Sequence, residues 1–379
     1  MRDHSNLGPA DVTDEQLTQM VADLLGTSAE DTEILTVRVD PVDYDLPAIT
    51  TAARHWVHGC ARAEGAERPF RIFVKHIQSW ARHPYFAFVP PEHRAAAAAG
   101  VPWRTEALAY RSDLGDRLPA GLTMPRALGV FDLDEESSAV WLQEVPVAEV
   151  TWDVGRYERA AHLLGRLAVS PRVQTLRDVG QFGWEVKRYV EGRLSMQVLP
   201  ILMDEGVWQH PLIADAFDDE LRARLQTAVA RVPSYAEELS ALPVATAHGD
   251  ACPNNLMARA GSDDFVLIDY GFWGPNPIGF DLGQLLVGDV QIGAGSSDQL
   301  ADVEAAVVPA YVEGLRAEGS DIAVDVVRRA HALQLLVFSG LSALPFEFLD
   351  RPPDEALHRT AQDRAAIARF SLDLVDATA

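Results

Sequence analysis

The sequence has few lysines, few cysteines and no long apolar run. Only two of its 32 basic residues are lysines, Lys75 and Lys187, and 56 acidic residues bring the formal charge to −24. Proteins that bind nucleic acids rely on clustered basic residues, so we expect no nucleic-acid partner. Cys60 and Cys252 allow at most one disulfide, which favours a reducing, cytoplasmic location.

Apolar stretches long enough to cross a membrane are missing as well. The longest candidate, residues 333–344, is interrupted by Gln334 and ends before Pro345, whereas a spanning helix needs about 20 apolar residues. No apolar stretch follows Arg2, so we expect neither a signal peptide nor a membrane partner. The 379 residues, 48% of them hydrophobic, predict two lobes with a sizeable core. The oligomeric state stays open.

Strand patterns dominate the first third of the chain. They cover residues 33–39, 48–57, 70–77, 126–131 and 139–145. A capped helix is predicted over residues 13–26 and a second over residues 103–114. We therefore expect residues 1–145 to form an N-terminal lobe, built on a five-stranded antiparallel sheet plus a helix.

Helical periodicity takes over from Val154. It continues to the C-terminus with one interruption, residues 245–286, which we expect to contain a hairpin. Residues 146–379 are accordingly predicted to form a mainly helical C-terminal lobe. The predicted fold class is α+β with two lobes.

The interruption contains most of the candidate catalytic residues. His248-Gly249-Asp250 is followed four residues later by Asn255, and a second apolar segment ends in Asp269. A turn centred on residues 261–263 would form a hairpin that places Asn255 opposite Asp269, about 5 Å away. Their oxygens suit Mg²⁺, whose other ligands are phosphates and water. Asp250 would lie beside them, where an aspartate can orient a hydroxyl and accept its proton.

This order of residues resembles the aminoglycoside phosphotransferase and choline kinase-like family, which has the bilobal protein-kinase-like fold. The resemblance extends to Gly279-Phe280-Asp281-Leu282 and covers about residues 30–345. It implies that Asp250 is the catalytic aspartate and that Asn255 and Asp269 are metal ligands. It also implies Mg²⁺ and a nucleotide donor, ATP or GTP, with residues 1–145 as the nucleotide-binding lobe and residues 146–379 holding the catalytic loop and the acceptor site.

The resemblance also extends to the residues that are expected to bind the nucleotide. Lys75 lies near the end of a predicted strand, on a face with apolar neighbours, so its charge needs a partner. The resemblance implies that this lysine holds the α- and β-phosphates and pairs with a glutamate on the next helix, for which Glu106 is the candidate. A solvated helix charge is the alternative for Glu106. Adenine is expected to bond the backbone near Glu144 and Val145, at the hinge.

Two positions depart from the family pattern. Residues 43–53 contain no glycine, although a phosphate-covering loop often uses glycines for close backbone approach. Asn254 stands where the family commonly has glycine. The first departure motivates an alternative, a kinase-fold module that binds a peptide or partner without catalysis.

Several polar residues have simpler explanations. Asp281 precedes an apolar helix and is predicted to cap it. His248 is expected to be a packed loop residue, and Cys252 has no catalytic partner around it. His55, His58 and Cys60 lack the second ligand pair that zinc needs.

The acceptor is expected to meet the helical lobe. Phe182-Gly183-Trp184-Glu185, Trp208-Gln209-His210 and the acidic run 215–220 are the informative segments there. An acidic, aromatic cleft would favour a cationic acceptor, and a solvated acidic face is the alternative.

The predicted function is an ATP- or GTP-dependent phosphotransferase that acts on a hydroxyl of a small molecule. Candidate acceptors are an aminoglycoside, another antibiotic, or a sugar or amino-alcohol metabolite, so antibiotic resistance and biosynthesis both stay open. A further alternative is phosphorylation of a peptide Ser or Thr in natural-product maturation. Fold and catalytic core do not determine the substrate.

Overall fold

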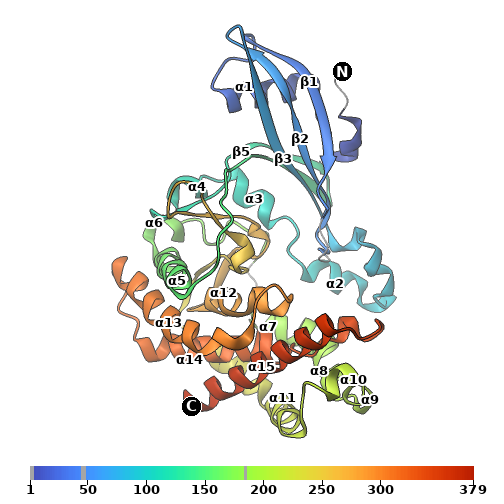
Figure 1. The fold of residues 1–379 in the computed structure, drawn as a ribbon, viewed down its shortest axis with the longest axis vertical. Coiled ribbons are helices and arrows are strands. Elements are labelled where there is room, and N and C mark those ends of the chain that lie inside the picture. Colours follow the sequence, from blue (N-terminus) through green and yellow to red (C-terminus); the bar gives the residue numbers. More distant parts are fainter. Residues whose placement is uncertain (1–3, 44–47, 183–185) are drawn as a thin grey trace.

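The computed structural model describes residues 4–43, 48–182 and 186–379. Part of the glycine-free segment, residues 44–47, and part of the candidate acceptor segment, residues 183–185, lie outside these ranges. The sheet lies at one end of the molecule and the helices at the other (Figure 1).

A five-stranded antiparallel sheet forms the N-terminal lobe, as predicted. Its strands are β1 (Thr32–Pro41), β2 (Thr51–Ala63), β3 (Ala66–Gln78), β5 (Ala127–Asp134) and β6 (Ser137–Gln143), in the order β1-β2-β3-β6-β5. The predicted second strand is too short, because β2 and β3 continue as a long hairpin to a tight turn at Glu64 and Gly65. Both turn residues have positive φ, the conformation that two-residue hairpin turns require.

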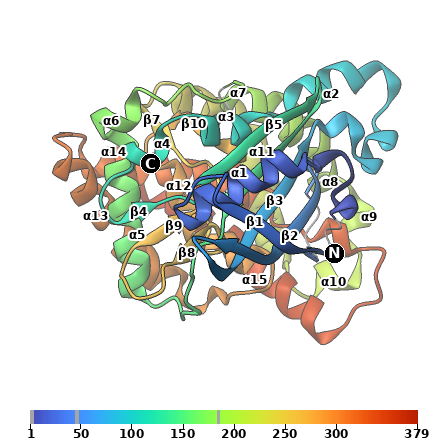
Figure 2. The ribbon, with the colours of Figure 1, turned by 90° about the horizontal axis from the view of Figure 1, so that it is seen from above.

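Helix α1 (Asp14–Leu25) packs on one face of this sheet (Figure 2). Thr13 caps it: the Thr13 hydroxyl accepts from the Gln16 N–H, and the Gln16 side chain accepts from the Thr13 N–H. Its apolar residues Leu17, Met20 and Val21 are buried against the sheet. The opposite face of the sheet bears Lys75, which contacts Asp269 of the helical lobe.

Short helices connect β3 to the rest of the sheet. They are α2 (Arg94–Gly100), α3 (Thr105–Arg111) and α4 (Leu114–Arg117), and the two-residue strand β4 (Leu122–Thr123) follows them. Chain segment 80–93 consists mainly of three short 3₁₀ turns. β6 ends at Gln143, and we propose the boundary between the lobes just after it, at residues 145–146.

The C-terminal lobe is mainly helical, as predicted. Its α-helices are α5 (Val154–Val169), α6 (Pro171–Gln174), α7 (Val186–Tyr189), α8 (Leu199–Leu202), α9 (Glu205–Trp208), α10 (Pro211–Ala214), α11 (Asp219–Ser240), α12 (Phe280–Gln291), α13 (Leu300–Ala317), α14 (Val324–Leu335) and α15 (Glu355–Ala377). Two π-helical segments, Val190–Val198 and Leu336–Gly340, extend α7 and α14. None of the helices in the described ranges combines the length and apolar character needed to cross a bilayer.

Two small strand pairs interrupt the helices and present the polar segment. β7 (Val244–Ala247) pairs with β10 (Gly274–Pro277), and β8 (Leu256–Ala258) pairs with β9 (Phe265–Leu267). The predicted hairpin register is wrong by one residue, because Leu256 faces Leu267 and Asn255 therefore faces Ile268. Asp269 lies beyond the strand, where its backbone turns away at φ 62°.

Candidate active site

Lys75 lies in the middle of a buried ion-pair cluster. Its Nζ is 2.6 Å from Glu106 Oε2 and 3.1 Å from Asp269 Oδ1, and only 5% of the residue is exposed. Burial acts to lower the pKa of Lys75, but the negative charges of Asp269 and Glu106 outweigh it and raise that pKa. The lysine is therefore a fixed cation between two lobes, because Glu106 precedes the hinge and Asp269 follows it.

Helix α3 positions Glu106. The backbone N–H of Gln181 donates to the Thr105 hydroxyl next to it, which ties the helix start to the helical lobe. One turn further on, Tyr110 makes an edge-to-face contact with Tyr270, the residue after Asp269. Glu106 is 4% exposed, so the alternative of a solvated helix charge is wrong.

Asp269 reaches Lys75 because the chain turns sharply after β9. Its φ of 62° lies in the left-handed region, which aspartate tolerates better than most residues. Burial acts to raise the pKa of Asp269, but Lys75 outweighs it and lowers that pKa, so the carboxylate stays ionised.

The catalytic-loop candidates begin at His248, which is fully buried. Its Nε2 donates to the Ile268 carbonyl at 3.0 Å, and its Nδ1 accepts from the Asp250 N–H at 3.4 Å. Burial lowers the pKa of His248 to about 4, so the ring is neutral at pH 7. His248 is thus a packed loop residue, as predicted, and it ties the loop to the end of β9.

Gly249 allows the loop to pass close to the segment after Asp269. Its φ is +88°, and a Cβ at this position would lie 2.2 Å from the Phe272 carbonyl oxygen. Both observations exclude any larger residue. The glycine of the His-Gly-Asp motif therefore has a steric cause.

Asp281 holds the same loop from helix α12, a role that sequence reasoning missed. Its two carboxylate oxygens accept from the N–H groups of His248 at 2.9 Å and Gly249 at 2.8 Å. The predicted helix cap is wrong, because α12 begins after Gly279 without a side-chain cap. The detectable signal was a carboxylate within an otherwise apolar helix, since a buried carboxylate needs donors.

Asp250 and Asn255 lie together, as the spacing predicts. Asn255 Nδ2 donates to the Asp250 backbone oxygen at 2.9 Å and to Asp250 Oδ2 at 3.1 Å. Burial raises the pKa of Asp250 to about 7, and the nearby charge of Asp269 acts in the same direction while Asn255 opposes it. Asp250 is thus a carboxylate with an unusually high pKa, and both Asn255 and Asp269 act on it.

The donor set fits a magnesium ion that completes its shell with phosphates. Because Asn255 uses its amide nitrogen on Asp250, its amide oxygen is oriented as the acceptor end of the group. No group of three or more His, Cys, Asp or Glu side chains that could hold a metal occurs among the described residues. One carboxylate and one amide oxygen match Mg²⁺ bound together with phosphates and water.

Helix α12 supports the catalytic loop at a second point. A Cβ on Gly288 would lie 2.4 Å from Cys252 Cβ, so the loop rests directly on the helix there. Burial raises the pKa of Cys252 to about 12, so this thiol stays protonated and unreactive, consistent with the incidental role expected of it.

The hinge candidates, Glu144 and Val145, directly follow β6. Arg71 Nη1 on β3 lies 2.6 Å from Glu144 Oε1, and the Arg71 guanidinium stacks 3.8 Å above the Trp56 ring. Val145 is half-buried beside Glu144. The Glu144 side chain is therefore engaged with the sheet.

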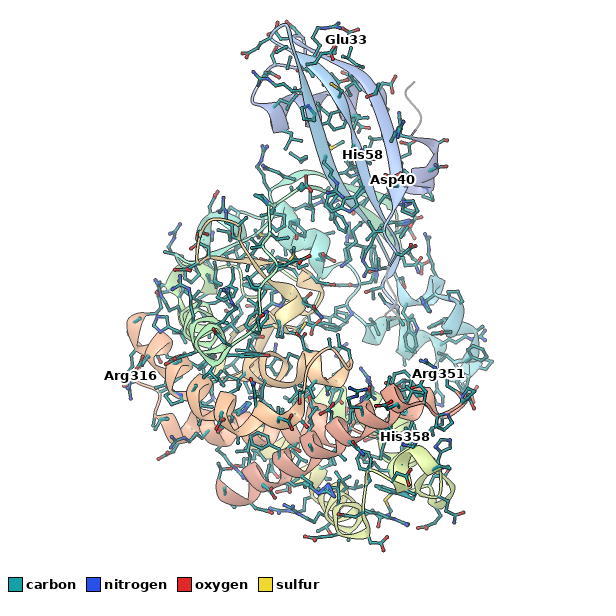
Figure 3. The ribbon with its side chains drawn as sticks, viewed as in Figure 1. Glu33, Asp40, His58, Arg316, Arg351 and His358 are labelled. Carbon is teal, nitrogen blue, oxygen red and sulfur yellow. The ribbon has the colours of Figure 1, made fainter. Side chains whose placement is uncertain are left out.

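Two carboxylates of the acidic run, residues 215–220, have structural partners. Asp218 caps α11 and lies 2.6 Å from Arg369, while Asp215 lies near His358, which Figure 3 labels in the part of the helical lobe farthest from the sheet. Trp208 is core, 6% exposed, and donates to the Leu202 carbonyl. These contacts favour the alternative, a solvated acidic face, for residues 215–220. Because residues 183–185 lie outside the described ranges, an acidic, aromatic acceptor site that includes them stays a prediction.

The two histidines of β2, His55 and His58, both have neighbours within the sheet. His58 Nε2 lies 2.7 Å from Asp40 Oδ2 on β1 (Figure 3). His55 faces the neighbouring Val74 on β3, and burial lowers the pKa of His55.

The comparisons place the chain among phosphotransferases. The family model described as phosphotransferase enzyme family matches residues 76–317. A search of curated protein sequences gives no match.

Three solved structures are similar across most of the chain. A putative aminoglycoside phosphotransferase from Ralstonia eutropha is 14% identical, with a TM-score of 0.48, covering 95% of this chain and 98% of that one. An amicoumacin kinase, solved with AMP-PNP, Ca²⁺ and its antibiotic, is 14% identical, with a TM-score of 0.46 and coverages of 99% and 96%. A choline/ethanolamine kinase family protein from Mesorhizobium loti is 16% identical, with a TM-score of 0.45 and coverages of 89% and 92%.

Proposed function

The chain belongs to the phosphotransferase enzyme family, and from that premise we propose that it transfers the terminal phosphoryl group of ATP or GTP to a hydroxyl of a small molecule. One observation carries the proposal. Glu106, Lys75, Asp269, Asp250 and Asn255 come from four separate segments: ion pairs join Lys75 to Glu106 and Asp269, a hydrogen bond joins Asn255 to Asp250, and the charge of Asp269 acts on Asp250.

Asp250 is the proposed catalytic residue. Its carboxylate would orient the acceptor hydroxyl and take up its proton as the oxygen attacks the γ-phosphorus. The bond between the acceptor oxygen and the γ-phosphorus forms, the bond from that phosphorus to the β–γ bridging oxygen breaks, and the nucleoside diphosphate leaves. A pKa of about 7 suits a base that works near neutral pH.

Asn255 and Asp269 are the proposed magnesium ligands. When bound there, Mg²⁺ would neutralise negative charge on the phosphates of the donor. Lys75 would hold the α- and β-phosphates, and Glu106 would keep its ammonium in place. Glu144 and Val145 would offer their backbone to the nucleobase.

The acceptor is proposed as a hydroxyl-bearing small molecule. The acidic end of the helical lobe gives no reason to prefer a cation, because Asp218 caps α11 and pairs with Arg369, and Asp215 lies near His358. We therefore leave aminoglycosides, other antibiotics, sugars and amino alcohols as equal candidates, together with a peptide Ser or Thr. Resistance and biosynthesis are both compatible with this chemistry.

A transfer assay with matched donors and acceptors tests the proposal. The protein is incubated with Mg²⁺ and either ATP or GTP against each acceptor class, and phosphorus NMR follows the products. We expect a new phosphomonoester together with nucleoside diphosphate for one acceptor class. Strong magnesium-dependent nucleotide binding without transfer to any acceptor would favour the non-catalytic binding module. Absence of nucleotide binding would contradict both.

A further inference from the structure

Arg54 stands directly opposite Lys75 in the sheet. The two residues are paired across β2 and β3, so their side chains leave the same face of the sheet. This face is turned towards the helical lobe, because Lys75 on it meets Asp269. Side chains opposite each other on antiparallel strands start about 5 Å apart. A second cation is thus placed at the phosphate end of the candidate active site.

The charge of Arg54 acts on the whole Lys75 cluster. It favours the ionised carboxylates of Asp269 and Glu106 and disfavours the charged ammonium of Lys75. Like charges directly opposite in a sheet are destabilising. The nearby carboxylates offset part of this repulsion, and an anion bound between the two cations would offset it further.

The sequence around Arg54 lacks the usual means of holding phosphates. Residues 43–53 immediately before it contain no glycine, so a backbone cradle made by close approach of glycines is not available there. A guanidinium presents several donors in a planar fork that matches phosphate oxygens. Arg54 follows this segment directly and could supply the donors that the loop backbone does not.

We propose that Arg54 binds the phosphates of the donor nucleotide together with Lys75 and takes over part of the role of a glycine-rich phosphate loop. This inference rests on the proposed function, because it assumes a nucleotide in the cleft. It assigns Arg54 to phosphate binding and leaves the nucleobase to the hinge. Loss of Arg54 should therefore weaken binding in proportion to the phosphates that the ligand carries.

Titration calorimetry with purified full-length protein tests this inference by binding alone. Mg-ATP, Mg-ADP and adenosine are titrated into the wild type and into Arg54→Ala, Arg54→Gln and Arg54→Lys. We expect Arg54→Ala and Arg54→Gln to weaken Mg-ATP and Mg-ADP binding about tenfold or more and adenosine binding less than about twofold. Arg54→Lys should restore part of the loss, since it keeps the charge without the planar fork.

Arg62→Ala is the matched control. Arg62 lies on the same strand eight residues further on and pairs with Glu33 and Glu67 at the far end of the sheet, where Figure 3 labels Glu33. Its removal should leave all three affinities unchanged. Circular dichroism and thermal unfolding of each variant establish that it is folded, and Arg54→Gln retains most of the side-chain volume if Arg54→Ala does not.

Three results would overturn the inference. Wild-type affinity of the folded Arg54→Gln variant for Mg-ATP would show that Arg54 does not bind phosphate. An equal loss for adenosine and Mg-ATP would assign Arg54 to shaping the sheet. A wild type that binds neither these three ligands nor Mg-GTP, Mg-GDP and guanosine would remove the premise, and this result is distinguishable because it contradicts the proposed function as well.

Discussion

Lys75 and Lys187 have opposite surroundings although both have carboxylate neighbours. Lys75 is almost fully buried and contacts two carboxylates within 3.1 Å. The Lys187 side chain is 72% exposed, and its Nζ lies 3.7 Å from Glu191. Water screens an exposed pair, whereas a buried ion requires its partners. The buried lysine therefore marks the site, and the exposed one contributes to the surface charge.

The same contrast separates the two ends of the helical lobe. Near the sheet, Asp281 is buried, Asp250 and Asp269 are half-buried, and each of the three carboxylates has a defined partner. At the far end, the carboxylates around α10 and α11 cap helices or pair with arginines at the surface. Burial with specific partners, rather than the number of acidic residues, identifies the reactive region.

Replacing the buried lysine should have the largest effect. Lys75→Met leaves Glu106 and Asp269 without their cation, so we expect a loss of about 3–5 kcal/mol in the free energy of unfolding. Turnover should fall about 10²- to 10³-fold, because a fixed charge at the phosphates is removed. Denaturant unfolding and the transfer assay measure the two effects. If Lys187→Met lost as much stability and turnover as Lys75→Met, burial would not distinguish the two lysines.

The support of the catalytic loop by α12 should show as a smaller, mainly kinetic effect. Gly288→Ala places a methyl group where Cys252 Cβ lies 2.4 Å away, so the loop must shift. Displacing a catalytic group by about 1 Å can cost about 10²-fold, so we expect kcat to fall by roughly 10- to 100-fold with less change in nucleotide affinity.

Gly283→Ala on the same helix is the control for this substitution. Nothing lies within 4 Å of a Cβ at Gly283, so activity should be retained and the helix stabilised by about 0.5–1 kcal/mol. A Gly288→Ala enzyme with wild-type kcat would show that the loop does not depend on α12 at this point.

The fold was predictable from the sequence because strand and helix periods are local signals. The order and approximate position of all five sheet strands followed from them, as did the helical lobe. The hairpin register was not predictable to one residue, because residues 259–264 join Ala258 to its partner Phe265 and turn chemistry around Gly261 does not fix the pairing across a loop of this length.

The site was predictable only in part. The spacing of Asp250, Asn255 and Asp269 along the chain indicated their chemistry, but the contact of Asp281 with the loop depends on tertiary packing that brings α12 to residues 248–249. Trp208 illustrates the opposite error, since an aromatic residue in an acidic region was assigned to the acceptor and is in fact core.

A buried titratable group without a carboxylate partner provides a contrast with Lys75. His331 on α14 is 1% exposed, and burial lowers its pKa to about 4. The unfolded chain takes up a proton below about pH 6.5 and the folded chain does not, so stability is full above that pH and decreases as the pH falls towards 4. The loss should approach about 3 kcal/mol. Comparing the pH dependence of unfolding for the wild type and His331→Leu measures it, and an unchanged slope would contradict this assignment.

Neutralising the acidic end of the helical lobe should have the smallest effect. Asp215→Asn, Asp219→Asn and Glu220→Gln together leave the Asp218 cap intact and remove three exposed charges. Such charges are screened beyond about 8–10 Å at ordinary ionic strength, so nucleotide affinity and turnover should stay within about twofold. If the triple variant raised the KM at low salt for a cationic acceptor alone, this region would be shown to attract the substrate.

The most direct test of the central claim compares Asp250→Asn with the wild type in the same two assays. Because the amide keeps the shape of the carboxylate but cannot take up the proton of the acceptor, phosphate transfer should fall at least about 10²-fold. Mg-ATP affinity should remain within a few-fold of the wild type. Transfer at the wild-type rate by folded Asp250→Asn would contradict the account, because it would place the catalytic base elsewhere.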